Sequence, residues 1–107
     1  MGYSFYIASK TKPISLDDFR YVITNLSKFN KNGLHGEMAC DFFLEGHGYL
    51  RVAGSFGISG KYAEGFVLNV VVLLINLGHI PKVLSHDWGY GTKEEWEWFD
   101  SIRNPQG

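Results

Sequence analysis

The sequence predicts an α+β domain in which a very apolar helix lies at the centre. Three observations support this prediction: stretches in which apolar residues recur at every second position, an amphipathic helical stripe over residues 16–29, and a nearly uniform apolar run over residues 63–77. A period of two is typical of strands and a period of 3.6 is typical of helices. Both kinds of element are therefore expected in one domain.

Residues 63–77 are the segment that the rest of the chain has to cover. Their apolar side chains occupy most of the helical circumference. Only one narrow stripe is small or polar, namely Gly65, Asn69, Val72 and Asn76. The run is too short to span a bilayer, and Gly78 supplies a helix stop. A buried core helix, covered by more than one neighbour, is therefore favoured.

The other elements follow from shorter patterns. Ser15 is a good N-cap for the first helix, and Thr92 with Glu95 forms a capping box that opens the last one. The remaining elements are strands over residues 3–8, 34–45, 49–58 and 80–88. The order β-α-β-β-α-β plus a helix is that of the ferredoxin-like or split βαβ fold, a four-stranded antiparallel sheet with two helices on one face.

The sequence leaves the position of the last helix open, but it predicts the extent of the domain. The last helix either covers a flank of the helical layer or lies over the open face of the sheet. Residues 1–103 are expected to form a single domain and residues 104–107 a flexible tail.

Composition and charge limit the classes of function. The 107 residues have a formal net charge of −1, which gives no overall attraction to nucleic acid or anionic lipid. The charge is uneven, because residues 1–31 carry five basic and two acidic residues, whereas residues 87–102 carry five acidic residues and one lysine. Cys40 is the single cysteine and no secretory signal pattern is present, so a cytoplasmic protein without an internal disulfide is expected.

The C-terminal region supports the leading functional hypothesis. Aromatic and acidic residues gather there, namely Asp87, Trp88, Tyr90, Glu94, Trp96 and Glu97. An exposed Trp96 framed by acids has the composition of an interface hot spot, and the acids would steer a basic partner. We therefore expect a small protein-binding module without a catalytic site or cofactor, of an inhibitor or immunity type, that docks a basic protein such as a nuclease toxin.

A second hypothesis is a homodimer. A central helix this apolar is hard to bury within a 107-residue domain. A second copy of the chain would therefore cover either the small-residue stripe of the helix or the open face of the sheet.

Two binding alternatives remain. Ser59, Gly60 and Lys61 precede the central helix, where free amides are able to hold an anion or a nucleotide cofactor. With Arg51 and Gly54 before it, this loop resembles the pyrophosphate-binding turn of acetyl-coenzyme A-dependent acetyltransferases. Its arginine-to-glycine spacing differs, so no residue roles are transferred.

RNA binding through the open sheet face is the other alternative, with Tyr6, Tyr49 and Arg51 as candidate residues. The basic-glycine-aromatic octapeptide of RNA-recognition modules is missing, and acidic residues on the same face oppose phosphate, so nucleic acid is a disfavoured partner.

The four histidines give no sign of a metal site or of acid–base catalysis. They are scattered, without a metal-ligand spacing. We expect His35, His47, His79 and His86 to be exposed turn residues.

Overall fold

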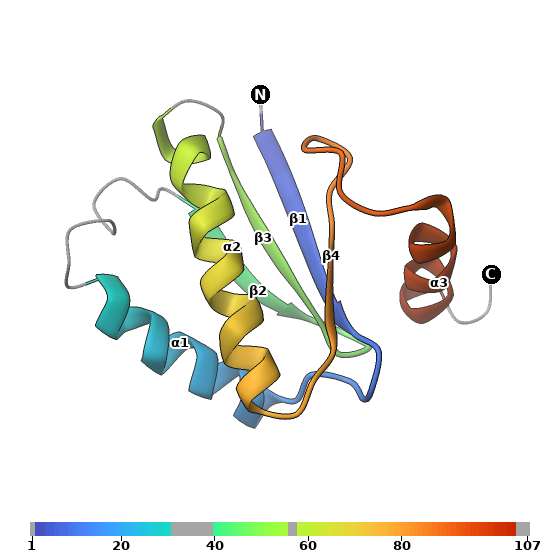
Figure 1. Cartoon of the computed structure of the whole chain (residues 1–107), viewed down its shortest axis with the longest axis horizontal. Coiled ribbons are helices and arrows are strands. Elements are labelled where there is room, and N and C mark those ends of the chain that lie inside the picture. Colours follow the sequence, from blue (N-terminus) through green and yellow to red (C-terminus); the bar gives the residue numbers. More distant parts are fainter. Residues whose placement is uncertain (1, 31–39, 56–57, 105–107) are drawn as a thin grey trace.

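The computed structural model describes residues 2–30, 40–55 and 58–104, apart from the side chains of residues 27–30, 40, 55 and 58–62. Four strands and three helices occur in these ranges (Figure 1). In chain order they are β1 (Gly2–Ser9), α1 (Leu16–Asn30), β2 (Cys40–Glu45), β3 (Tyr49–Ser55), α2 (Ile58–Asn76), β4 (Pro81–Leu84) and α3 (Lys93–Arg103).

The four strands form one antiparallel sheet in the order β2-β3-β1-β4. Helix α1 connects β1 to β2, and β3 lies between those two strands. Helix α2 connects β3 to β4, and β1 lies between them. Two βαβ units are interleaved in this way, and α1 and α2 pack together on one face of the sheet (Figure 1). The predicted α+β class and its four-stranded antiparallel sheet are confirmed.

Strand β1 has apolar side chains on both of its faces. Tyr3, Phe5 and Ile7 point toward α1 and α2 and are almost completely buried, whereas Tyr6 and Ala8 point to the opposite face. This division follows from the alternation of side chains along an extended strand. Both faces of the sheet at β1 therefore need to be covered.

The main core lies between the sheet and the helices α1 and α2. The buried side chains that α2 contributes are Ala63, Val67, Val70, Leu73 and Leu74. They recur at intervals of three and four residues, so they line one side of the helix. Full burial of a large aliphatic side chain stabilises the folded state by roughly 1.5–3 kcal/mol. This side of α2 is therefore a major source of stability.

Helix α3 covers the opposite face of the sheet, which decides the alternative that the sequence left open. Phe99 is fully buried against Ala8 and Leu84, and Tyr6 and Tyr49 pack around it. The predicted capping box is present, because Glu95 N–H donates to Thr92 Oγ1 (3.1 Å) and Thr92 N–H donates to Glu95 Oε1 (2.9 Å).

Several element boundaries differ from the prediction. The described part of β3 reaches Ser55, which pairs with Gly2 of β1, and residue 58, the predicted end of this strand, is instead the first residue of α2. Helix α2 begins at Ile58 rather than at residue 63. Strand β4 ends at Leu84 rather than at residue 88, because Ser85 and Tyr90 exchange backbone hydrogen bonds and the chain folds back along the edge of the sheet. The predicted strand residues 34–39 lie outside the described ranges.

The β2–β3 turn is fixed against the connection between β1 and α1. Ile14 N–H donates to the carbonyl oxygen of Gly48 (2.9 Å). Gly48 has a φ of +79°, and a Cβ at this position would lie 2.5 Å from Pro13 Cβ and 2.9 Å from Pro13 Cα. Only glycine satisfies both the backbone conformation and this close approach.

We predict that Gly48→Ala lowers the free energy of unfolding by about 1–3 kcal/mol, the usual cost of a left-handed conformation in a non-glycine residue. Urea denaturation measures the change. Gly46→Ala is the matched control in the same turn, because a Cβ there has no neighbour within 4 Å. Equal stability of the two variants would contradict this account of the turn.

Candidate functional site

The residues of the predicted acidic–aromatic face lie on two sides of the sheet. Trp88 stacks on Phe5, with ring centroids 5.6 Å apart, on the side of α1 and α2. Trp96 stacks on His86, with centroids 3.8 Å apart, and packs edge-on against Tyr6 on the side of α3. The edge of the sheet separates the two tryptophans. They therefore do not form one continuous surface.

The expectation of an exposed Trp96 is wrong, because its ring is partly buried. A Cβ on Gly91 would lie 2.8 Å from Trp96 Nε1, which shows how closely the ring is packed. The reason is the rotation of α3, whose sheet-facing centre is Phe99. Trp96 lies one turn before Phe99 and therefore also points toward the sheet.

The acidic residues of the predicted acidic–aromatic face lie on different elements. Glu94 and Glu97 are exposed on α3. Asp87 is exposed on the hairpin after β4, where its Oδ2 accepts a hydrogen bond from Ser4 N–H (3.0 Å). Asp87 thereby holds the hairpin to the start of β1.

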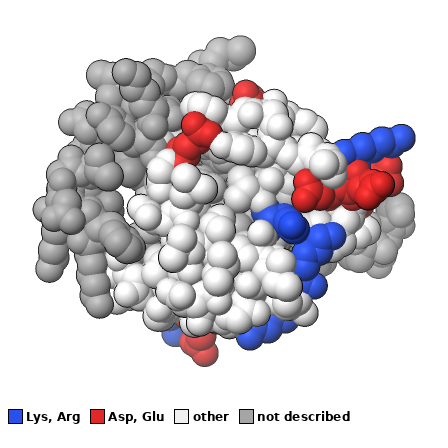
Figure 2. Space-filling model, in the orientation of Figure 1, with Lys and Arg blue, Asp and Glu red and all other residues white. Residues whose placement is uncertain are grey.

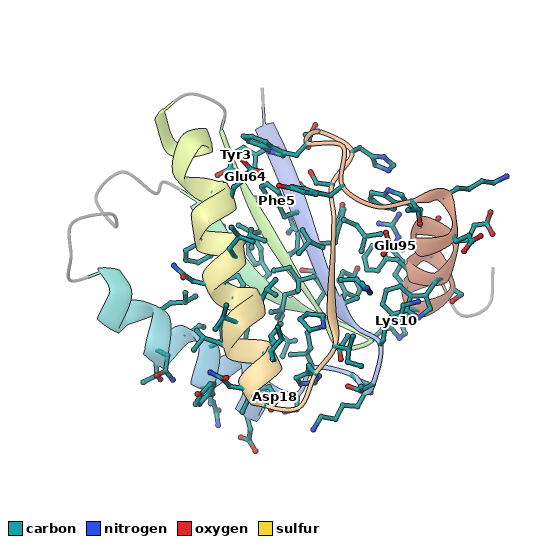
Figure 3. The ribbon with its side chains drawn as sticks, viewed as in Figure 1. Tyr3, Phe5, Lys10, Asp18, Glu64 and Glu95 are labelled. Carbon is teal, nitrogen blue, oxygen red and sulfur yellow. The ribbon has the colours of Figure 1, made fainter. Side chains whose placement is uncertain are left out.

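Tyr90, which follows Trp88 on the hairpin, connects the hairpin to α2. Its hydroxyl donates to Glu64, and this hydrogen bond raises the pKa of Tyr90, with desolvation and the negative charge of Glu64 acting in the same direction. Glu64 lies in the N-terminal half of α2 and lines a cavity together with Phe5, whereas Glu95 belongs to α3 (Figure 3).

A small apolar cavity of about 60 Å³ lies between α2, β4 and Tyr90. Its lining residues are Phe5, Glu64, Val67, Leu68, Val83 and Tyr90. Glu64 is the one charged residue in this lining. The cavity therefore has the form of an apolar recess with a carboxylate beside it.

The outer side of α2 continues this apolar recess. Leu68, Val72 and Ile75 have exposed fractions of 62%, 55% and 54%. They recur at intervals of three and four residues and so form one face of the helix. Figure 2 shows this side of the molecule, where uncharged atoms cover most of the described area over α2, with an acidic group near its upper end and basic groups on the side of β4.

The outward stripe of α2 differs from the predicted one. The exposed stripe includes three of the predicted residues, Gly65, Val72 and Asn76, whereas Asn69 is half-buried. It also includes Leu68 and Ile75, which were not predicted to be part of it. Within the described ranges no other element covers this stripe. Helix α2 is covered by more than one neighbour, as expected, because α1 and the sheet pack against it, but Leu68, Val72 and Ile75 remain exposed.

The predicted anion-binding residues Ser59, Gly60 and Lys61 belong to the first turn of α2 rather than to the loop before it. Their side chains lie outside the described part of the structure.

The predicted RNA-binding residues lie on the face of the sheet that α3 covers. The rings of Tyr6 and Tyr49 have their centroids 5.1 and 4.9 Å from that of Phe99. Burial raises the pKa of Tyr49, and the charge of Glu45 adds to the rise. Arg51 Cζ lies 4.4 Å from the centre of the Phe43 ring, and Arg51 Nε lies 3.7 Å from Glu45 Oε1. In this conformation the two tyrosines are occupied by intramolecular packing.

A buried polar cluster of Ser9, Asp18 and His79 was not predicted. His79 is only 3% exposed, so the expectation of an exposed turn residue is wrong. Its Nδ1 lies 2.8 Å from Ser9 Oγ, and its Nε2 lies 2.8 Å from Asp18 Oδ2. A carboxylate only accepts hydrogen bonds, so Nε2 carries a proton and donates it to Asp18. The cluster joins the end of β1, the start of α1 and the turn after α2.

Asp18 is the charged member of this cluster. Its burial acts to raise its pKa, but hydrogen bonds from His79 and from Ser15 N–H outweigh burial and leave the pKa below its usual value of 3.8. A carboxyl group with a lowered pKa stabilises the fold above the pKa of the unfolded chain, and this contribution is lost as the pH falls through the folded pKa.

We predict that Asp18→Asn lowers the free energy of unfolding at pH 7 by about 1–3 kcal/mol, the range for hydrogen bonds to a charged group. The difference from the wild type should shrink as the pH falls below about 4. Denaturation at pH 7 and pH 3 measures both effects. Asp17→Asn, in the same helical turn but with its side chain 94% exposed, is the control and should change stability little. A difference that stays constant with pH would contradict the role of Asp18.

No three His, Cys, Asp or Glu side chains in the described ranges gather into a group that could hold a metal ion. Across the same ranges, no helix has the length and apolar character needed to cross a membrane.

Comparison of the chain with protein-family models, with curated proteins and with solved structures finds no match. The structure thus defines an α+β domain with interleaved βαβ units.

Proposed function

We propose that the protein is a non-enzymatic binding module that docks a basic protein partner through the outer face of α2 and the adjoining apolar cavity. A module of this kind acts by occupying its partner, as an inhibitor or immunity protein does. The single observation that supports the proposal most strongly is the exposure of Leu68, Val72 and Ile75 on one helix face.

A continuous patch of exposed apolar side chains is unusual on a soluble protein. Isolated exposed hydrophobic residues are common on soluble proteins, but contiguous ones mark interaction sites. Leu68 belongs both to the helix face and to the cavity lining, so the two features are continuous. A partner side chain that enters the cavity would be surrounded by apolar atoms, which is the usual setting of an interface hot spot.

The charge at the edge of this surface supports a basic partner. Glu64 lines the cavity, and Asp87 is exposed on the hairpin that also contains Tyr90. Opposite charges around an apolar centre speed encounter and select the partner. We therefore expect the docked segment to present an aliphatic or aromatic side chain next to lysine or arginine.

The experiment is selection of binders from a displayed peptide library, followed by affinity measurement on variants. We expect the selected peptides to contain an apolar anchor beside a basic residue. Leu68→Lys should weaken their binding about tenfold or more, as loss of a hot-spot contact does. Leu16→Lys is the matched control, because Leu16 is an exposed leucine (52%) that starts α1 and lies outside the cavity lining.

Equal loss of affinity in the two variants, or no loss in Leu68→Lys, would overturn the docking surface. Sedimentation of the wild type and of Leu68→Lys measures the oligomeric state and tests whether a second copy of the chain covers this face instead of a different protein. A dimer of the wild type that Leu68→Lys converts to a monomer would assign the face to a second copy of the chain and contradict the basic-partner proposal.

A further inference from the structure

A second, larger cavity lies at the opposite end of β1 from the α2 recess. Its volume is about 240 Å³. Its walls are residues 8–13 of β1 and the following connection, His47 and Gly48 of the β2–β3 turn, and Ile102 of α3. Three separate parts of the chain therefore line this half-open recess. The Ile14–Gly48 backbone hydrogen bond ties two of these parts together beside the cavity.

The polar groups of the wall are suited to an anion. Lys10 and Lys12 supply two ammonium groups, whereas the hydroxyls of Ser9 and Thr11 are engaged by His79, by each other and by the carbonyl oxygen of Gly78. His47 adds an imidazole from the turn, whereas no aspartate or glutamate is among the lining residues. Cationic groups that line a recess without carboxylates are complementary to an oxyanion.

The wall is held in place by interactions on its far side. Ser9 Oγ lies 2.8 Å from His79 Nδ1 and 3.0 Å from Thr11 Oγ1, and it accepts a hydrogen bond from Thr11 N–H (3.3 Å). Lys10 Nζ lies 3.9 Å from the centre of the Trp98 ring (Figure 3 shows Lys10 beside α3). A preformed site loses less conformational entropy when a ligand binds.

The size of the cavity selects the ligand. Pockets for drug-sized ligands occupy about 300–1,000 Å³, and this cavity is smaller. From its size and charge we infer that the cavity binds a phosphate group, either as free phosphate or as the head of a small phosphomonoester. Lys12 is the principal cationic contact. This site is independent of the docking surface on α2.

The test is titration of ¹⁵N-labelled protein with inorganic phosphate and, separately, with O-phosphoserine, at constant ionic strength. We expect saturable shifts of the amide signals of residues 9–12 and of residues 47–48. Tighter binding of O-phosphoserine would identify a phosphomonoester as the ligand, and tighter binding of inorganic phosphate would identify the free ion.

Lys12→Gln should weaken phosphate binding about tenfold, which is the effect of losing one charge-assisted hydrogen bond. Lys93→Gln is the control, because it removes the same charge from an exposed lysine that begins α3, outside the cavity lining. Both lysines are exposed, so neither variant disturbs the core. Shifts that rise linearly without saturation, or equal weakening in the two variants, would show general charge screening and overturn the site.

Discussion

Burial of both faces of β1 is the constraint on which the rest of the structure depends. A strand that places Phe5 on one face and Tyr6 on the other cannot leave either face in water without a large loss of hydrophobic stabilisation. Helices α1 and α2 meet this requirement on one side, and α3 meets it on the other. The rings of Tyr6 and Phe99, 5.1 Å apart, show how closely α3 is joined to the sheet. Helix α3 is therefore an integral layer of the domain.

Features that depend on neighbours in sequence were predictable. The alternation of β1, the N-cap at Ser15 and the capping box of Thr92 and Glu95 each follow from residues that lie a few positions apart, and the structure contains all three. The buried face of α2 was not predictable in this way, because apolar side chains occupy most of the circumference of this helix. Local pattern was sufficient for the class and for the order of the elements.

Features that depend on distant parts of the chain were not predictable. His79 lies 70 residues from Ser9 and 61 from Asp18, so no spacing pattern connects the three. The end of β4 is set by the pairing of Ser85 with Tyr90, which the strand's own residues do not encode. Trp96 was expected to be exposed, but it lies one turn before Phe99, the centre of the buried face of α3. In each case tertiary contact overrode the local pattern.

The layering of the domain places its candidate binding surfaces away from the C-terminal aromatic residues. The aromatic residues that suggested a C-terminal docking face are largely used to attach α3 and the hairpin to the sheet. The apolar surface that the described chain leaves open is instead on α2, beside a carboxylate from Glu64. The cavity lined by Lys10 and Lys12 lies at the other end of β1, with α3 as one of its walls. The same layering that buries β1 thus leaves one apolar and one basic recess at separate places.

The most direct test of this account is thiol labelling of two single-cysteine variants in a Cys40→Ser background, at concentrations where the protein is monomeric. Ala8→Cys lies beneath α3, and Val72→Cys lies on the outer face of α2. The account predicts that Val72→Cys reacts at nearly the rate of a free thiol, whereas Ala8→Cys reacts only as fast as the protein opens. Rapid labelling of Ala8→Cys, or protection of Val72→Cys in the monomer, would contradict it.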